Sequence, residues 1–165
     1  MTAILKRMPV GIAGAISRPQ DLTVEPVILK ASNLFLIYGT AGKYDDEGYF
    51  VPLEAGDTAE VIKGIYVRPY PTTSAPNRAL VVGLDKNFPG DAMKRGYMTV
   101  QVHGDASLLR RGSPVYVLNA QDDTISVPIG GFVASAIDGL TVELPNAEFT
   151  GAGLNDGIAE ISWKI

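Results

Sequence analysis

The sequence has no cysteine and only one histidine, His103. Without cysteine the chain forms no disulfide, and it offers neither a thiol nucleophile nor a thiolate ligand for a metal ion. A single imidazole does not complete the usual zinc ligand sets. The acidic pairs Asp45-Asp46 and Asp122-Asp123 could supply oxygen ligands to calcium, but neither has the ordered spacing of an EF-hand loop. The sequence therefore predicts no metal site and no cofactor.

Long apolar runs are also missing. The best candidate, residues 26–38, is interrupted by Lys30 and Asn33 and is too short for a membrane-spanning helix. Near the N-terminus, the basic residues Lys6 and Arg7 are followed by Pro9 instead of the apolar stretch of a signal peptide. We therefore expect a protein without a membrane partner, made and used in solution, most simply in a cytoplasm.

The chain carries little charge, with 19% charged residues, 46% hydrophobic residues and a net charge of −4. The first 43 residues hold five basic and two acidic side chains, whereas the others hold nine basic and sixteen acidic ones. An acidic body argues against nucleic acid as a partner, because phosphate binding requires clustered lysine and arginine. The basic leading segment fits either an electrostatic match to a protein surface or charge scattered for solubility.

The residues that are abundant favour β-structure. Fifteen valines and thirteen isoleucines suit pleated strands, while eighteen glycines and eleven prolines leave little room for long helices. In residues 97–103, Met98, Val100 and Val102 share one face and polar side chains occupy the other. The same period of two recurs in residues 140–144 and 159–165. These patterns predict an all-β fold with a compact β-barrel or β-sandwich body and little helix.

Turn residues divide the remaining apolar segments into short strands. We expect strands at residues 27–30, 34–38, 61–67, 79–84, 114–118 and 132–137. The intervening turns are expected at residues 38–42, 45–48, 87–91, 120–123 and 138–139. The one helical turn that the pattern allows lies near residues 92–95.

Three segments differ from this pattern. Residues 1–26 combine small apolar side chains with proline and glycine, so they fit either an extended N-terminal arm on a neighbouring molecule or a segment packed on its own body. Residues 69–78 form a proline-rich linker or loop, and residues 149–157 a flexible loop before the last strand. We therefore divide the chain into an arm (1–26), an N-terminal β part (27–68), the linker (69–78) and a C-terminal barrel or sandwich body (79–165).

No catalytic motif stands out. His103 lies close in sequence to Asp105 and Ser107, but a triad needs the histidine between acid and nucleophile, and no G-x-S-x-G elbow is present. The spacing of a phosphate-binding loop is also absent. Trp163 alternates with apolar residues in the last expected strand, which favours the core or an interface over a sugar platform. The sequence therefore predicts a protein that is not an enzyme.

Several segments between residues 11 and 149 share their pattern with a known family. They are GIAGAISRP at 11–19, LEAGD at 53–57, GIYVRPYP at 64–71, RGYMTV at 95–100, RGSPVYV at 111–117 and ELPNAEF at 143–149. Together these segments resemble the structural cement, or head-decoration, proteins of tailed bacteriophages. The shared motifs are architectural and carry no catalytic chemistry.

The resemblance implies a non-enzymatic protein that binds the lattice of the major capsid protein and stabilises the phage head from its outer surface, after synthesis in the host cytoplasm. It also implies a homo-oligomer, with a trimer favoured over a dimer, and no nucleic-acid partner. The residues expected at the partner interface lie in the arm and beside the linker: Ile12, Ile16, Arg18, Arg68, Tyr70 and Pro71. The alternative is a carbohydrate- or receptor-binding β-module of a phage tail, which would present a cluster of exposed aromatic side chains.

Overall fold

The computed structural model describes residues 11–69, 86–154 and 157–164. In these ranges the chain forms strands and two short 3-10 turns, η1 (Ala59–Val61) and η2 (Ala106–Leu108), but no α-helix. No helix of the described chain is long and apolar enough to cross a membrane. The strands are β1 (Ile16–Leu29), β2 (Ala41–Tyr44), β3 (Phe50–Pro52), β4 (Gly64–Tyr66), β5 (Phe88–His103), β6 (Pro114–Leu118), β7 (Phe132–Val133), β8 (Thr141–Phe149) and β9 (Ile158–Lys164).

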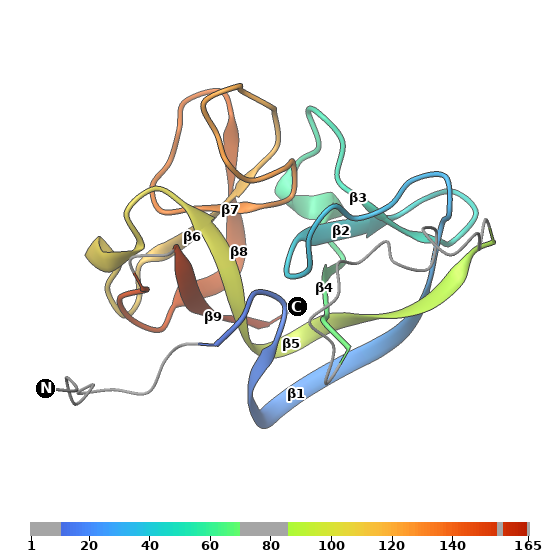
Figure 1. The fold of residues 1–165 in the computed structure, drawn as a ribbon, viewed down its shortest axis with the longest axis horizontal. Helices are drawn as coiled ribbons and strands as arrows, with labels where there is room; N and C mark the ends of the chain where they lie inside the picture. Colours follow the sequence, from blue (N-terminus) through green and yellow to red (C-terminus); the bar gives the residue numbers. More distant parts are fainter. Residues whose placement is uncertain (1–10, 70–85, 155–156, 165) are drawn as a thin grey trace, which may run out of the picture.

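The long strand β5 belongs to two closed rings of strands. One ring has the order β1-β3-β2-β4-β5, and the other has the order β5-β7-β6-β8-β9. Figure 1 shows the two rings as two lobes, with β5 passing from one into the other. Each ring closes through β5, although β1 pairs with β3 only at Leu29, so its second edge has no described partner strand over residues 16–28.

Strand β1 lies antiparallel to β5, from the pair Ile16–Met98 to the pair Leu29–Phe88. The register shifts between Arg18 and Thr23, where Asp21 has a positive φ of 60°. Gly96 faces this irregularity, and a Cβ added to it would lie 2.8 Å from the Cδ1 of Leu22. A glycine on β5 therefore makes room for the bulge in β1.

Apolar side chains fill both lobes. The larger cluster includes Met98, Val100, Phe132 and Ile161 and extends from the β6–β9 lobe towards β4. The smaller cluster, in the β1–β4 lobe, is built on aromatic stacking: the ring centroid of Phe35 lies 5.2 Å from that of Phe50 and 4.6 Å from that of Tyr66. Offset stacking of this kind adds to the free energy of burial and fixes the packing of the lobe.

The predicted fold class is confirmed, and so are several strands. Residues 114–118 form β6, and Met98, Val100 and Val102 of β5 are buried as the alternation predicts. The helical turn near residues 92–95 and the turn at 87–91 were wrong, because most of these residues belong to β5. Residues 34–38 are also not a strand: they form a loop that inserts Phe35 into the aromatic stack. The strand expected at 79–84 lies outside the described residues.

The division of the chain into arm, β part, linker and body stays a prediction. Strand β1 crosses the expected boundary at residue 26 and carries residues 16–26 into the sheet beside β5. The expected strand at 132–137 is shorter in the structure, where β7 ends at Val133. Residues 1–10 of the expected arm and residues 70–78 of the expected linker lie outside the described residues, as do residues 79–85.

Gly14 packs closely against β5 and the loop that contains Tyr38. Its N–H donates to the carbonyl of Thr99 at 2.7 Å, and its carbonyl accepts from the N–H of Arg68 at 2.8 Å. Its φ is +82°, and an added Cβ would lie 2.4 Å from the Cβ of Tyr38. Gly48 has a similar φ of +85°, but nothing lies within 4 Å of an added Cβ.

We expect Gly14→Ala to lower the free energy of unfolding by about 3 kcal/mol or more, because it adds a backbone clash to the strain of a left-handed conformation. Gly48→Ala should cost only about 1 kcal/mol, since it carries the strain alone. Urea unfolding of both variants measures the difference. Equal losses of stability would show that the contact between Gly14 and Tyr38 is unimportant.

Candidate functional site

Arg18 fastens β1 to β9. Its Nε and Nη2 donate to the two carboxylate oxygens of Glu160 at 3.1 and 2.5 Å, and its guanidinium lies 4.6 Å from the ring centroid of Tyr97. Thr150 donates a further hydrogen bond of 2.5 Å to Glu160. A bidentate arginine–carboxylate pair is directional, so it fixes both the position and the rotation of the strand.

The protonation of Glu160 follows from these contacts. Burial of the carboxyl group opposes its ionisation, but the hydrogen bonds from Arg18, Ser17 and Thr150 and the positive charge of Arg18 outweigh burial. The pKa of Glu160 is therefore lowered from its ordinary value of 4.5. The pKa of Arg18 is raised, first by its hydrogen bond to Glu160.

Residues 12–15 cross over β5 at Thr99. The hydroxyl of Thr99 donates to the carbonyl of Ile12 at 2.5 Å, and its N–H donates to the carbonyl of Ala15 at 3.0 Å. This cover leaves Thr99 only 1% exposed although it lies on the predicted polar face of the strand. The side chain of Ile12 is 49% exposed and is free to contact a partner.

The other predicted interface residues have partners within the chain or lie outside its described part. Ile16 is partly buried against the larger core cluster. The Nε of Arg68 donates to the carbonyl of Ala13 at 2.8 Å, and its guanidinium lies 4.5 Å from the ring centroid of Tyr38. Tyr70 and Pro71 lie outside the described residues. The structure thus brings Arg18, Ile16 and Arg68 together around residues 12–15, and their role at an interface stays a prediction.

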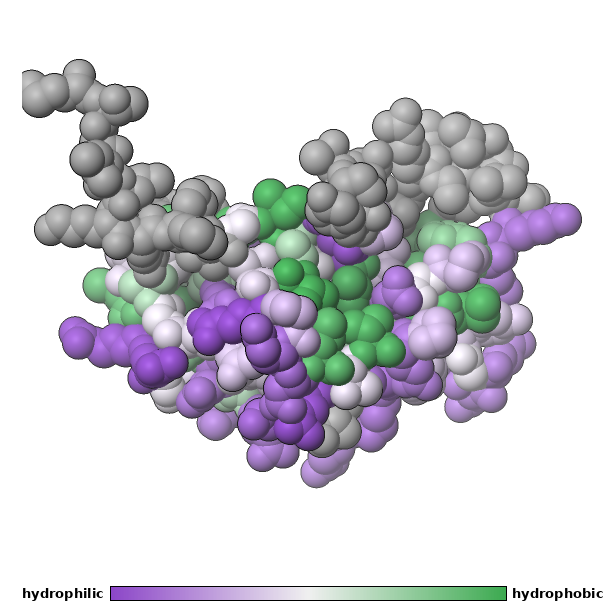
Figure 2. Space-filling model, turned by 90° about the horizontal axis from the view of Figure 1, so that it is seen from below, coloured by the Kyte–Doolittle hydropathy of each residue, from purple (hydrophilic) through white to green (hydrophobic). Residues whose placement is uncertain are grey.

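One face of β1 exposes apolar side chains that sequence reasoning missed. Val27 and Leu29 point into the core, so the alternate residues Pro26 and Ile28 point outward, and Ile28 is 47% exposed. Ile28 pairs with the exposed Pro89 of β5. With Leu22 and the half-buried Val24, these side chains make up the β1 apolar face. Figure 2, which views the molecule from the side of β1, shows apolar surface in the middle of this side with hydrophilic side chains around it.

Several charges beside the β1 apolar face are paired, whereas Asp91, the cross-strand neighbour of Pro26, has no ion pair with a described residue. Lys94 contacts Glu25 at 3.0 Å, and Arg95 and Lys164 both contact Asp21. A partner that covers this face would therefore meet mostly paired charges and would have to accommodate the carboxylate of Asp91. An apolar centre with such a rim is typical of a protein–protein contact.

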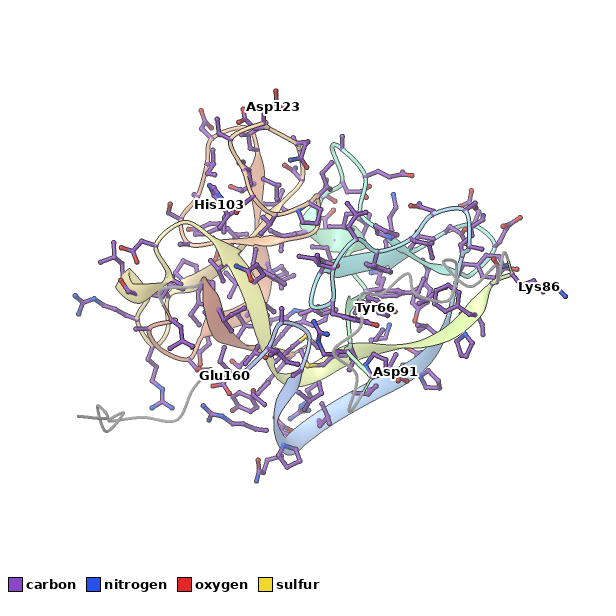
Figure 3. The ribbon with its side chains drawn as sticks, viewed as in Figure 1. Tyr66, Lys86, Asp91, His103, Asp123 and Glu160 are labelled. Atoms are coloured by element: carbon purple, nitrogen blue, oxygen red, sulfur yellow. The ribbon has the colours of Figure 1, made fainter. Side chains whose placement is uncertain are left out.

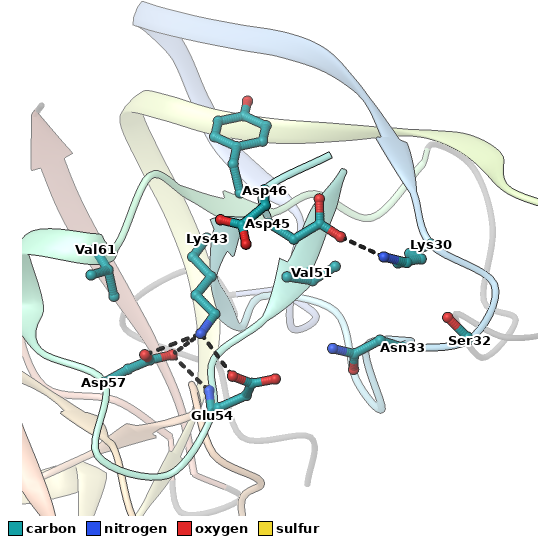
Figure 4. Close-up of a pocket in the computed structure, with 11 residues that line it drawn as sticks. Lys30, Ser32, Asn33, Lys43, Asp45, Asp46, Val51, Glu54, Asp57 and Val61 are labelled. Carbon is teal, nitrogen blue, oxygen red and sulfur yellow. Dashed lines mark hydrogen bonds and ion pairs between the residues drawn. The ribbon is translucent and has the colours of Figure 1, made fainter. Parts of the chain in front are cut away.

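A polar pocket of about 520 Å³ lies between the β1–β2 region and the loop after β3 (Figure 4). Lys30 contacts Asp45 at 2.8 Å and Glu47 at 2.6 Å, and these hydrogen bonds raise the pKa of Lys30. Across the pocket, Lys43 contacts Asp57 at 2.9 Å and Glu54 at 3.0 Å. These carboxylates are held by lysines, and the described residues contain no group of three or more acidic or histidine side chains that could hold a metal ion.

The residues considered for catalysis form separate pairs. The Nδ1 of His103 lies 3.0 Å from the Oγ of Ser126 and accepts from the N–H of Ser126 at 3.2 Å. Asp105 instead accepts from the N–H and hydroxyl of Ser107 at 2.9 and 2.6 Å, which closes the η2 turn. Figure 3 shows His103 near the loops of the β6–β9 lobe and Glu160 on the opposite side of that lobe. Among the described residues, His103 contacts Ser126 and no acidic side chain, so it connects β5 to the loop that carries Ser126.

The aromatic side chains lie mostly inside the lobes. Trp163 is 2% exposed and donates to the carbonyl of Pro145 at 3.2 Å. In the described ranges, every tyrosine and phenylalanine is buried or half-buried. The exposed aromatic cluster expected of a carbohydrate-binding tail module is therefore not found among these residues.

The chain is similar to known proteins in both sequence and fold. The family model of the XM1 gp53 minor capsid protein matches residues 1–163. The chain belongs to this family. A solved structure described as the capsid of Myoviridae Phage XM1 contains a chain that is similar over 98% of this chain and 95% of its own length, with a TM-score of 0.70 and 19% identity. A search of curated proteins found no match.

Membership of this minor capsid protein family confirms the predicted resemblance to structural proteins of the phage head. The likeness to the XM1 capsid chain, at 19% identity, shows the fold alone. The surface through which this minor capsid protein contacts a partner is therefore inferred from the residues of this chain. A signal for the β1 apolar face was present in the sequence, because Val27, Ile28 and Leu29 are apolar without interruption, as in strands covered on both faces.

The ion pair between Arg18 and Glu160 predicts a pH dependence of stability. Because the folded-state pKa of Glu160 is lowered, the pair stabilises the fold above pH 4.5 and loses its contribution as the pH falls through the lowered pKa. Glu160→Gln should lower the free energy of unfolding by about 1–2 kcal/mol at neutral pH. The loss should shrink in acid.

Urea unfolding near neutral pH and at about pH 3 measures this difference. The matched control is Glu148→Gln, since Glu148 is exposed and has no ion pair with a described residue. A loss for Glu160→Gln that stays constant with pH would contradict the role of its charge.

Proposed function

We propose that this protein is a decoration, or cement, protein that binds the outer surface of the phage head and stabilises the lattice of the major capsid protein. The observation that carries the proposal is the family match across residues 1–163. The two-ring fold adds support, because both rings close through β5 and so present a rigid surface. The role requires no catalysis, and the local pairing of His103 with Ser126 is consistent with that.

The β1 apolar face is the surface we propose for the contact with the major capsid protein. It combines the exposed side chains of Leu22 and Ile28 with rim charges that are neutralised within the chain. Burial of apolar area supplies the free energy of such a contact, at roughly 25 cal/mol per Å². Ile12, which is 49% exposed, extends this contact from the arm.

Because the binding site recurs over the capsid lattice, a contact of modest affinity is sufficient. Each copy binds a site that recurs over the shell, and copies that also contact one another gain avidity without any new contact to the capsid. We propose a homo-oligomer, with a trimer favoured, because a symmetric assembly can span the joints between several capsid subunits. Such bridging contacts resist separation of the subunits.

Binding to the shell is tested by co-sedimentation of the purified protein with undecorated capsids of its phage, followed by a heat challenge. We expect saturable binding that raises the temperature at which the shell breaks, because a ligand that binds only the intact shell stabilises it by mass action. Absence of binding at micromolar protein would overturn the proposed function.

The contact surface is tested by Ile28→Asp in the same assay. A carboxylate in the middle of the β1 apolar face must be desolvated on binding, so we expect affinity for capsids to fall at least about ten-fold, or about 1.4 kcal/mol. Leu108→Asp is the matched control, because Leu108 is 73% exposed on η2, away from β1. If Ile28→Asp binds as tightly as the control, the contact lies on another face.

A further inference from the structure

An apolar groove of about 380 Å³ lies between the loop that precedes β2 and the loop between β6 and β7. The two loops come from different lobes, so the groove follows the boundary between the two rings. It is lined by Asn33, Leu34, Phe35, Leu36, Thr40, Pro52, Leu53, Gln121, Pro128 and Ile129. It lies apart from the β1 apolar face, with which it shares no residue.

The floor of the groove is poorly covered. The side chain of Leu36 is 67% exposed, and Leu34, Pro128 and Ile129 beside it are only half-buried. The loop that holds them is well fixed, because Phe35 is buried in the aromatic stack and Thr40 donates to the carbonyl of Ile37 at 3.0 Å. A preformed apolar groove with exposed leucine favours an occupant with apolar side chains.

The rim of the groove is acidic. Asp122 and Asp123 follow the lining residue Gln121, whereas Glu54, which follows the lining residue Leu53, is paired with Lys43. No lysine or arginine is among the described residues that line the groove. The pattern is wider than the groove: the sequence between Arg111 and Lys164 has seven acidic residues and no basic one. Hydrogen bonds from Thr124 lower the pKa of Asp122, so this rim stays ionised at neutral pH.

The occupant that fits is an extended segment with aliphatic side chains next to lysine or arginine. The first ten residues of the chain, MTAILKRMPV, have this composition: Ile4, Leu5 and Met8 are apolar, and Lys6 and Arg7 lie between them. No other ten-residue segment outside the described residues combines adjacent basic residues with these aliphatic ones.

The tether places this segment close to the groove. Gly14 packs directly on Tyr38 and Gly39, which belong to the loop that carries the lining residues Leu36 and Thr40. From Gly11, ten extended residues reach up to about 33 Å. A tether this short gives an effective concentration of the order of millimolar, far above that of a second molecule in micromolar solution.

We propose that residues 1–10 bind in the apolar groove of the same molecule, with Ile4, Leu5 and Met8 over Leu36 and with Lys6 and Arg7 against the acidic rim. Docking shields both the arm and Leu36 from water in the free protein. The inference is independent of the capsid contact, because it concerns a different surface and is tested on the isolated protein.

Cross-linking tests the assignment directly, because the chain has no cysteine of its own. Leu36→Cys is combined with Ile4→Cys or with Met8→Cys, and each double variant is treated with a short bis-maleimide. We expect an intramolecular cross-link in the monomer. The control pairs each arm cysteine with Leu108→Cys, which is exposed and does not line the groove.

The cross-linking products distinguish an arm bound to its own molecule from an arm bound to a second copy. Covalent dimers through Leu36→Cys would show that the arm binds a second copy and would overturn the assignment to the same molecule. Cross-linking no faster than in the Leu108→Cys controls, from both arm positions, would overturn the groove as the binding site.

Proteolysis gives a second readout that needs no cysteine. Trypsin cleaves after Lys6 and Arg7, and docking of the arm should slow the loss of these residues measured by intact mass. Leu36→Asp should speed the cleavage about ten-fold, which corresponds to about 1.4 kcal/mol of lost docking. Leu108→Asp should leave the rate unchanged, and equal rates in the two variants would overturn the proposal.

Discussion

Strand β5 has a neighbour along both edges for most of its length, and both rings close through it. β1 follows one edge from Phe88 to Met98, while β4 and then β9 follow the other edge up to Gln101. Since the two rings share this one strand, a change in its register would open both. At Gly96, where φ is 135°, a larger residue would strain the backbone of β5 and displace the side chain of Leu22, whose Cδ1 lies 2.8 Å from an added Cβ.

The ion pairs of β1 are a consequence of this arrangement. Its charged residues find opposite charges on the strands beside them: Arg18 on β9, Asp21 on β5 and β9, and Glu25 on β5. Individually, exposed pairs of this kind contribute little to stability. Their larger effect is on the surface, because they neutralise the charges of Asp21, Glu25 and the basic side chains beside the apolar outer face of β1. The same contacts that fix the register therefore prepare a surface for another protein.

Period-two alternation predicted the buried face of β5, formed by Met98, Val100 and Val102, and the buried Ile161 and Trp163 of β9, because these residues share one core face. It failed for residues 16–26, where Pro19 and Pro26 argue against a strand. The structure resolves this conflict by placing β1 with β5 on only one of its edges over these residues, where proline is tolerated. The alternation also failed for residues 34–38. These residues form a loop in which the side chain of Phe35 is buried and Leu36 is exposed. The closure of two rings through β5 depends on long-range pairing, which no local pattern records.

The interface role of the predicted site residues stays a prediction, and the β1 apolar face was not predicted from the sequence. Arg18 and Arg68 were expected at an interface because of their residue type, yet each binds within the chain and secures residues 12–18 to the body. The expected arm therefore has two physically different parts. Residues 12–18 belong to the packed structure through Thr99, Gly14 and Glu160, so their removal would damage the fold itself. Removal of the segment before Gly11 leaves these contacts intact, and the aliphatic and basic residues of that segment are the reason that we assign it to the apolar groove beside Asp122 and Asp123.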